Sequence, residues 1–228
     1  MTESGAVSTA NLFDAALALG APYQLITSLC PLEPTWRLEG PSRCVRHFGS
    51  VDIFLEAIGQ SNAGDVLVID NDGRDDEGCI GDLVVIEALA AKLAGIIVWG
   101  RNRDSMDLRR IGLPVFSRGR CAAGPTRLDE RTANAFGQAR LDTATVRDGD
   151  WITADEDGVL ILRAADRGAV QRRALEIRTR EGAQARAVED GTSLRQQLGL
   201  DEFLRARERD STLTFRRHLG ERGGAIEV

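Results

Sequence analysis

The segment DVLVIDNDGRDDEGCIGDLVVIEALAAKLAGIIVWGRNRDSMDLRRIGLPVFS, residues 65–117, decides the fold. It contains short apolar runs of the kind that form buried strands, at 65–70, 95–100 and 113–117. Between them lie two segments with a helical pattern, at 81–94 and 104–110. Because strands that alternate with helices through short connections form parallel sheets, this segment predicts a parallel β-α-β-α-β core and an α/β fold.

The flanking sequence adds a second layer and a helical extension. On the N-terminal side we expect a helix at 11–19, a strand at 42–48 and a helix at 51–58. On the C-terminal side we expect further strands at 143–146, 151–154 and 159–162. Residues 165–190 are rich in Arg, Glu, Gln and Ala at helical spacing, and charged helical pieces follow. The chain is therefore predicted to divide into an α/β domain, 1–163, and a C-terminal helical extension, 164–228.

Composition excludes several classes of protein. The 228 residues carry a net charge of -6, which argues against a general nucleic-acid-binding surface, because phosphate binding needs clustered positive charge. No stretch approaches the roughly 18 apolar residues of a membrane span, and the N-terminus lacks the pattern of a secretory signal. We therefore expect no nucleic acid and no membrane as partners, and a cytoplasmic protein.

Motifs for several cofactors are missing from the sequence. The four cysteines form no CxxC pair, and two histidines cannot build a three-histidine zinc site. There is no Walker loop, no GxGxxG after a strand and no GxSxG. Any metal chemistry must depend on carboxylates and water, which favours a hard ion such as magnesium.

Polar residues follow two of the predicted strands at one edge of the sheet. Gly81, Asp82 and Leu83 open a helix, whose free N–H groups can receive a carboxylate. After the next strand, Arg103 can pair with a carboxylate and Asp104 can hold a divalent cation. A small anion and a metal would fit there. The alternative is that Asp82 caps a helix, and that Arg103 and Asp104 form a surface salt bridge or Asp104 is a second cap.

The acidic run at 70–77 invites a calcium interpretation, but its glycine falls at position four, whereas an EF-hand loop needs it at position six. We interpret this run as a solvated turn.

Several motifs in order resemble the RraA-like family, which includes the regulator of ribonuclease activity A and class II aldolases that cleave 4-hydroxy-4-methyl-2-oxoglutarate. They are NLFDAALALG (11–20), GDVLVIDNDG (64–73), the pair Gly81-Asp82, AGIIVWGRNRD (94–104) and DWITADEDGVLIL (150–162). The resemblance covers residues 10 to 163 and implies a layered β/β/α swivelling-type domain. Trp99 stands where many aldolases of the family carry an aspartate, which leaves the choice of substrate open.

The resemblance also implies roles for individual residues. Asp104 resembles the aspartate that binds Mg²⁺ or Mn²⁺ directly. Arg103 resembles the arginine that binds the pyruvyl group and steadies the enolate, and Asp82 the aspartate that holds a metal-bound water. Backbone amides around Leu83, within Gly81–Leu83, resemble those that receive the substrate carboxylate. In the aldolases a glutamate of an adjacent subunit completes the metal's outer shell, for which Glu181 is the first candidate and Glu176 the second.

These roles predict a divalent-metal-dependent lyase that cleaves a C–C bond of a 4-hydroxy-2-oxo dicarboxylic acid, or decarboxylates oxaloacetate, through a pyruvate enolate. The alternative is a non-catalytic RraA-like regulator that binds and inhibits a ribonuclease. A third interpretation is an enzyme that acts on another 2-oxo or hydroxy acid. The resemblance further implies a homotrimer or homohexamer, and leaves open which of the two forms.

Overall fold

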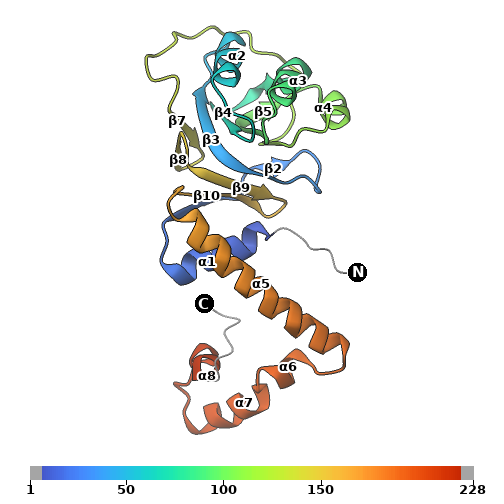
Figure 1. Ribbon diagram of the computed structural model, residues 1–228, viewed down its shortest axis with the longest axis vertical. Coiled ribbons are helices and arrows are strands. Elements are labelled where there is room, and N and C mark those ends of the chain that lie inside the picture. Colours follow the sequence, from blue (N-terminus) through green and yellow to red (C-terminus); the bar gives the residue numbers. More distant parts are fainter. Residues whose placement is uncertain (1–6, 222–228) are drawn as a thin grey trace.

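The structure is a computed structural model that describes residues 7–221 (Figure 1). Its strands are β1 (Tyr23–Ile26), β2 (Cys30–Pro31), β3 (Leu38–Arg46), β4 (Val66–Ile80), β5 (Gly95–Asn102), β6 (Val115–Ser117), β7 (Gln138–Leu141), β8 (Ala144–Arg147), β9 (Trp151–Asp155) and β10 (Gly158–Leu162). Its helices are α1 (Thr9–Leu19), α2 (Asp52–Gly59), α3 (Asp82–Ala90), α4 (Ser105–Ile111), α5 (Arg167–Glu189), α6 (Leu194–Gln197), α7 (Leu200–Arg209) and α8 (Phe215–Glu221).

The centre of the sheet is parallel. The strand order is β1-β10-β9-β3-β4-β5-β6-β2, and β7 and β8 pair separately. Strands β3, β4, β5 and β6 run parallel, whereas β1, β10 and β9 are antiparallel to their neighbours. Because β4, α3, β5, α4 and β6 follow one another along the chain, the predicted α/β fold with its β-α-β-α-β core is confirmed.

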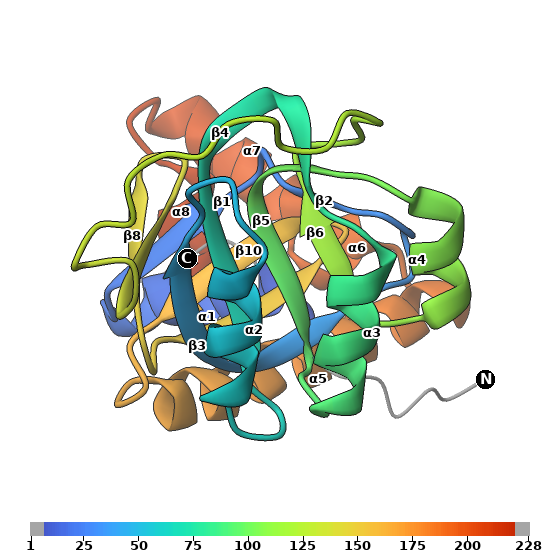
Figure 2. The same ribbon diagram turned by 90° about the horizontal axis from the view of Figure 1, so that it is seen from above.

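The central strands bury side chains on both faces, which explains their uninterrupted apolar runs. Leu67 and Ile69 of β4 pack in one core with residues of α2, α3 and α4, while Val66 and Val68 pack in a second core with β7 to β10. Figure 2 shows α2 and α3 lying over β4 and β5. Each fully buried aliphatic side chain contributes roughly 1.5–3 kcal/mol. The result is the layered arrangement of one helical and two sheet layers.

The second half of β4 differs from the sequence prediction. Residues 70–77 do not form a solvated turn: they belong to β4, with register shifts against β5. Glu77 is buried and binds Arg127, with its Oε1 3.0 Å from Nη2, and the Asp70 carboxylate accepts the Arg140 N–H. The prediction was wrong because these basic and backbone partners come from residues 50 or more positions further along the chain.

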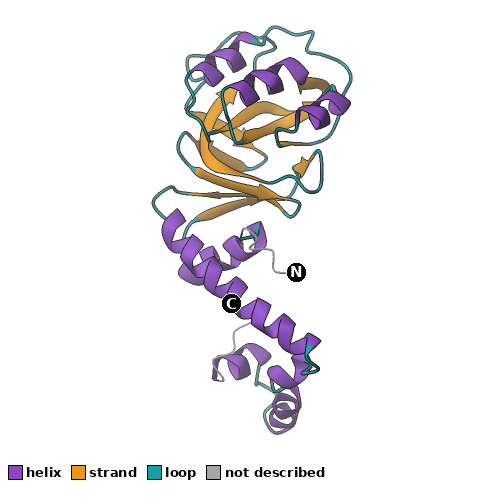
Figure 3. Cartoon of the chain, turned by 45° about the vertical axis from the view of Figure 1, so that its right-hand side comes forward, coloured by secondary structure: helices purple, strands orange, loops and turns teal. Residues whose placement is uncertain are grey.

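The C-terminal region is helical, as predicted. The first part of α5 packs on α1 and β10 through Val170, Ala174 and Ile177, and the rest of α5 leads away from the sheets to α6, α7 and α8 (Figure 3). Phe203 and Phe215 hold α7 and α8 together, with ring centroids 4.9 Å apart. Within residues 7–221, no helix combines the length and the apolar character needed to cross a membrane.

Candidate active site

A cavity of about 210 Å³ lies where β4 and β5 end and α3 and α4 begin. Its lining includes the residues singled out from the sequence: Gly81, Asp82, Leu83, Arg103 and Asp104. They come together because β4 and β5 are parallel neighbours, so that the residues following the two strands meet at one edge of the sheet. Their roles in binding and catalysis stay predictions.

Asp104 connects the two loops of the cavity. Its Oδ2 accepts the Arg103 Nε–H at 3.0 Å and lies 3.4 Å from the backbone nitrogen of Asp82. The backbone N–H of Arg103 donates to the Ile80 carbonyl at 2.9 Å, which ties the same loops a second time. The side chains of Arg103 and Asp104 are 44% and 30% exposed, so water screens this ion pair and it adds little stability. Its value lies in placing a cation and an anion side by side.

The backbone of Asp104 lies in the left-handed region, with φ 54° and ψ 35°. For a residue other than glycine this conformation costs about 1 kcal/mol. Asp104 occupies the N-cap position of α4, but its side chain makes no capping hydrogen bond. Capping of α4 by the Asp104 side chain is therefore wrong as a prediction, whereas the alternative of a surface ion pair between Arg103 and Asp104 is confirmed. The Asp104 carboxylate also faces the start of α3.

Three glycines make space for the two charged side chains. A Cβ on Gly81 would overlap Asp104 Oδ2, a Cβ on Gly124 would lie 2.7 Å from Arg103 Nη1, and a Cβ on Gly78 would lie 2.8 Å from Arg103 Cβ. Gly81 has φ -133°, which any residue adopts, so the requirement at this position is for space alone.

We expect Gly81→Ala to lower the free energy of unfolding by about 1–3 kcal/mol, because the new methyl group must displace the Asp104 carboxylate or the backbone. Chemical denaturation measures the change. Gly59→Ala is the matched control, since a Cβ there meets nothing within 4 Å. Equal stability of the two variants would contradict the tight contact at Gly81.

The backbone amides at the start of α3 already have partners. The Leu83 N–H donates to Asp82 Oδ1 at 2.8 Å, and the Asp82 N–H points to Asp104. The prediction that these amides receive a substrate carboxylate therefore requires the carboxylate to replace the two side chains as the acceptor. The Leu83 side chain is 76% exposed beside the cavity.

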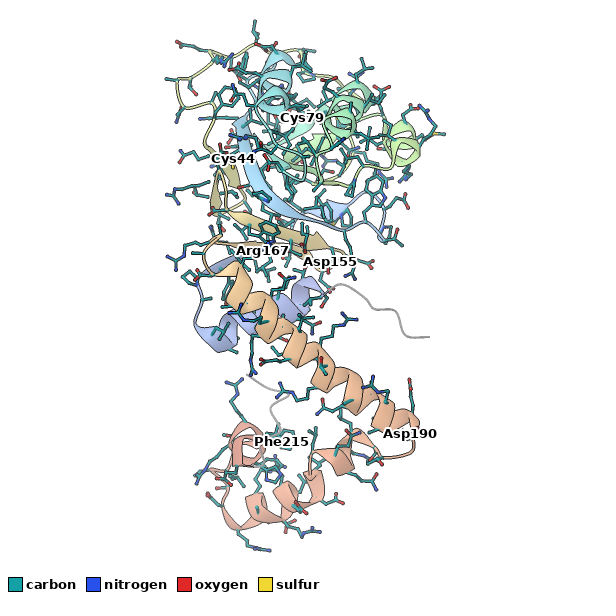
Figure 4. All side chains as sticks on the ribbon, in the orientation of Figure 1. Cys44, Cys79, Asp155, Arg167, Asp190 and Phe215 are labelled. Atoms are coloured by element: carbon teal, nitrogen blue, oxygen red, sulfur yellow. The ribbon has the colours of Figure 1, made fainter. Side chains whose placement is uncertain are left out.

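Glu181 and Glu176 do not line this cavity within one chain. Glu181 accepts a hydrogen bond from Asn11 Nδ2 at 2.8 Å, and Glu176 pairs with Arg173 at 2.9 Å. In Figure 4 Cys79, which lines the cavity, lies at the opposite end of the molecule from Asp190 at the end of α5. The prediction for these glutamates concerns an adjacent subunit, and it stays a prediction.

The donor set of the cavity is compatible with magnesium. Within the described residues, no group of three or more His, Cys, Asp or Glu side chains could hold a metal ion. The cavity offers the carboxylates of Asp82 and Asp104. Binding through one or two carboxylates, with water as the remaining ligands, is usual for Mg²⁺ and unusual for structural zinc.

Sequence reasoning missed His47, which also lines the cavity. It follows β3, the parallel neighbour of β4, and its Nδ1 lies 2.8 Å from Asn71 Oδ1. Its pKa is lowered, chiefly by burial, so the imidazole is neutral at pH 7. The rule that ligands bind beyond the carboxyl ends of parallel strands applies to β3 as well, and it was the available signal for His47.

The fold and cavity define a layered α/β protein with paired charges at the carboxyl edge of a parallel sheet. The chain belongs to the RraA-like family: the family model described as Aldolase/RraA matches residues 9–161.

Named relatives and solved structures agree with this assignment. A protein of Halalkalibacterium halodurans with the provisional name 4-hydroxy-4-methyl-2-oxoglutarate aldolase is 28% identical over 174 residues, which cover 76% of this chain and 82% of that protein. A protein of Burkholderia mallei with the same provisional name is 33% identical over 159 residues, 68% of this chain and 94% of that protein.

Among solved structures, an uncharacterized protein from Pseudomonas syringae matches with a TM-score of 0.73 and 26% identity, covering 83% of this chain and 92% of that one. Streptomyces coelicolor RraAS2, described as an unusual member of the RNase ES inhibitor RraA protein family, matches with a TM-score of 0.68 and 24% identity, covering 77% and 90%. This second likeness concerns the fold.

Proposed function

We propose that this protein is a divalent-metal-dependent lyase that cleaves a C–C bond of a 2-oxo acid and releases pyruvate through its enolate. The observation that carries the proposal is the convergence of Arg103, Asp104 and Asp82 on one small cavity. The provisional aldolase names of two relatives support the same reaction class.

Arg103 is the group suited to stabilise the negative charge that develops during cleavage. Its Nε donates to Asp104, which leaves the other guanidinium N–H groups to bind a carboxylate and the developing enolate oxygen. Charged donors that are fixed before the reaction lower barriers because they need no reorganisation in the transition state. Asp82 can hold a water molecule beside the substrate, through which a proton moves.

Asp104 is the residue that would hold Mg²⁺ or Mn²⁺ directly, and Asp82 would hold a water molecule bound to the ion. Such an ion would supply Lewis-acid polarisation of the 2-oxo group. Glu181 or Glu176 of an adjacent subunit remains our proposal for the outer shell of the ion.

The reaction can be either aldol cleavage of a 4-hydroxy-2-oxo dicarboxylic acid or decarboxylation of oxaloacetate, because both leave an electron pair on C3 of pyruvate. A homotrimer or homohexamer is part of the proposal. The oligomer is supported by exposed apolar side chains on α3 and α4, since such surfaces often form interfaces between subunits. They are Leu83, Ile86, Leu89 and Met106, which are 76%, 44%, 45% and 83% exposed.

The direct test measures pyruvate release from oxaloacetate and from 4-hydroxy-4-methyl-2-oxoglutarate, with Mg²⁺ or with a chelator, against enzyme-free blanks at each condition. We expect turnover of at least one substrate that the chelator abolishes and Mg²⁺ or Mn²⁺ restores. Release that ignores the chelator, or no release above the blanks, would refute the proposal.

The alternative, a non-catalytic regulator, has a different signature. It predicts inhibition of a ribonuclease that survives Arg103→Ala, since the inhibitory surface need not include the cavity. We favour the enzyme because the two charged side chains are accommodated by glycines that a scaffold would not require.

A further inference from the structure

His47 occupies a position in the cavity that the proposed chemistry has not yet used. It lies directly after β3, and its side chain is 1% exposed. Its ring stacks on Phe54 of α2, with centroids 4.7 Å apart and an interplanar angle of 30°. Both residues line the same cavity as Arg103 and Asp104. The imidazole is therefore rigidly held at the wall of the proposed active site.

The surrounding hydrogen bonds determine which ring nitrogen carries the proton. Arg127 Nη2 donates to Asn71 Oδ1 at 3.0 Å, and Arg127 is itself fixed by Glu77. Because a guanidinium can only donate, the Asn71 oxygen must face it, and the reverse amide orientation would place two donors, the Asn71 NH₂ and the Arg127 N–H, against each other. The same oxygen lies 2.8 Å from His47 Nδ1, so Nδ1 carries the proton and donates it.

Nε2 consequently holds a lone pair. The hydrogen bonds of the His47 ring with residues 7–221 all involve Nδ1, and none involves Nε2. The charged groups that face the ring are Glu77 of β4 and Arg127 and Asp129 of the connection that follows β6, and the Cys79 thiol lies 3.5 Å from Nδ1. Burial raises the pKa of that thiol well above its usual range, so it stays uncharged. Because His47 lines the cavity, a ring nitrogen that the described residues leave unpaired is suited to accept an O–H group of a ligand.

We propose that His47 is a catalytic residue whose Nε2 takes the proton of the C4 hydroxyl of a 4-hydroxy-2-oxo acid. This inference rests on the proposed lyase function and narrows it to aldol cleavage. As Nε2 takes the proton, the C4–O bond becomes a carbonyl, the C3–C4 bond breaks, and its electron pair goes to C3 to form the pyruvate enolate. Return of the proton from Nε2 to C3 yields pyruvate and restores neutral His47, so the step needs no other reactant.

The two candidate reactions differ in their need for this residue. Decarboxylation of oxaloacetate has no hydroxyl proton to remove, whereas aldol cleavage cannot proceed without its removal. We expect His47→Asn to lower kcat for 4-hydroxy-4-methyl-2-oxoglutarate by about 10²-fold or more, the usual contribution of a positioned base, and to lower oxaloacetate decarboxylation far less. Asparagine keeps an N–H near the position of Nδ1 for Asn71 but has nothing at Nε2.

His218→Asn is the matched control. It removes the other histidine of the sequence, which lies on α8 and approaches the Leu198 carbonyl at 3.3 Å. Both reactions should proceed normally in this variant. His47→Gln provides a second substitution, since its amide can accept a hydrogen bond near Nε2 but cannot take up a proton.

The pH profile gives a readout that a purely structural role would not produce. In the wild-type protein, aldol cleavage should fall on the acid side as Nε2 becomes protonated, while decarboxylation should lack this limb. This difference tests the inference even if both His47 variants fail to fold. Identical acid limbs for the two reactions, an equal loss of both in a folded variant, or wild-type decarboxylation without aldol cleavage would each overturn it. If the wild-type protein releases pyruvate from neither substrate, the lyase function fails first, and the inference fails with it.

Discussion

Arg103→Ala is expected to lower the turnover number for pyruvate release by roughly 10²- to 10³-fold, the effect of removing one donor that stabilises developing negative charge. Arg103 donates from Nε to Asp104, so its guanidinium is held with the remaining N–H groups free for a ligand. Since these interactions strengthen as the enolate forms, kcat should fall more than KM rises. Steady-state kinetics with saturating Mg²⁺ measures both quantities.

Arg101→Ala is the control for this experiment. Arg101 lies two residues earlier on β5, and its side chain is 34% exposed and pairs with Asp75 at 2.9 Å, outside the cavity. It should retain wild-type turnover, because it removes a similar exposed ion pair without touching the site. Full activity of Arg103→Ala, or an equal loss in both variants, would show that Arg103 has no special part in the reaction.

Asp104→Asn should reduce turnover by about 10³-fold, because losing the carboxylate removes a ligand of the proposed cation and with it several kcal/mol of charge stabilisation. Asparagine has nearly the same volume and tolerates the left-handed backbone conformation observed at this position, with φ 54°. The substitution therefore changes the charge with little disturbance of the fold. Manganese binding, followed by electron paramagnetic resonance, should weaken in parallel.

Asp107→Asn is the corresponding control. Asp107 lies in the first turn of α4 and pairs with Arg110 at 3.0 Å on the outside of the helix. Manganese affinity should be unchanged in this variant. If Asp104→Asn bound manganese as tightly as the wild-type protein does, Asp104 could not be the metal ligand.

Much of the fold could be predicted because it follows from local patterns. The apolar runs in β4 and β5 contain side chains directed into two different cores, and such strands can be recognised without knowledge of their partners. The position of Asp82, Arg103 and Asp104 followed from a general property of parallel sheets, strengthened by the family resemblance. These three residues lie at the ends of elements whose types were predicted correctly.

The parts that could not be predicted depend on contacts between distant segments. The acidic half of β4 became strand because Glu77 binds Arg127, which lies in a connection without a regular sequence pattern. The proton on Nδ1 of His47 is placed by Asn71, 24 residues away, together with Arg127, 80 residues away, which leaves Nε2 as the acceptor. The conformation of Asp104 also has no local signal, since an aspartate before a helix usually caps it.

The extent of β4, from the middle of the sheet to the residue before Gly81, has a consequence for how this family can diversify. Strand β4 supports the edge of the sheet that carries the proposed active site, and its side chains also pack in two cores. Substitutions that change the course of this strand would therefore destabilise the fold. The exposed Leu83 side chain at the cavity packs in neither core. Substitutions at exposed positions around the cavity can therefore change which ligand binds while the strands beneath it stay the same. Proteins with this fold can in this way acquire different functions.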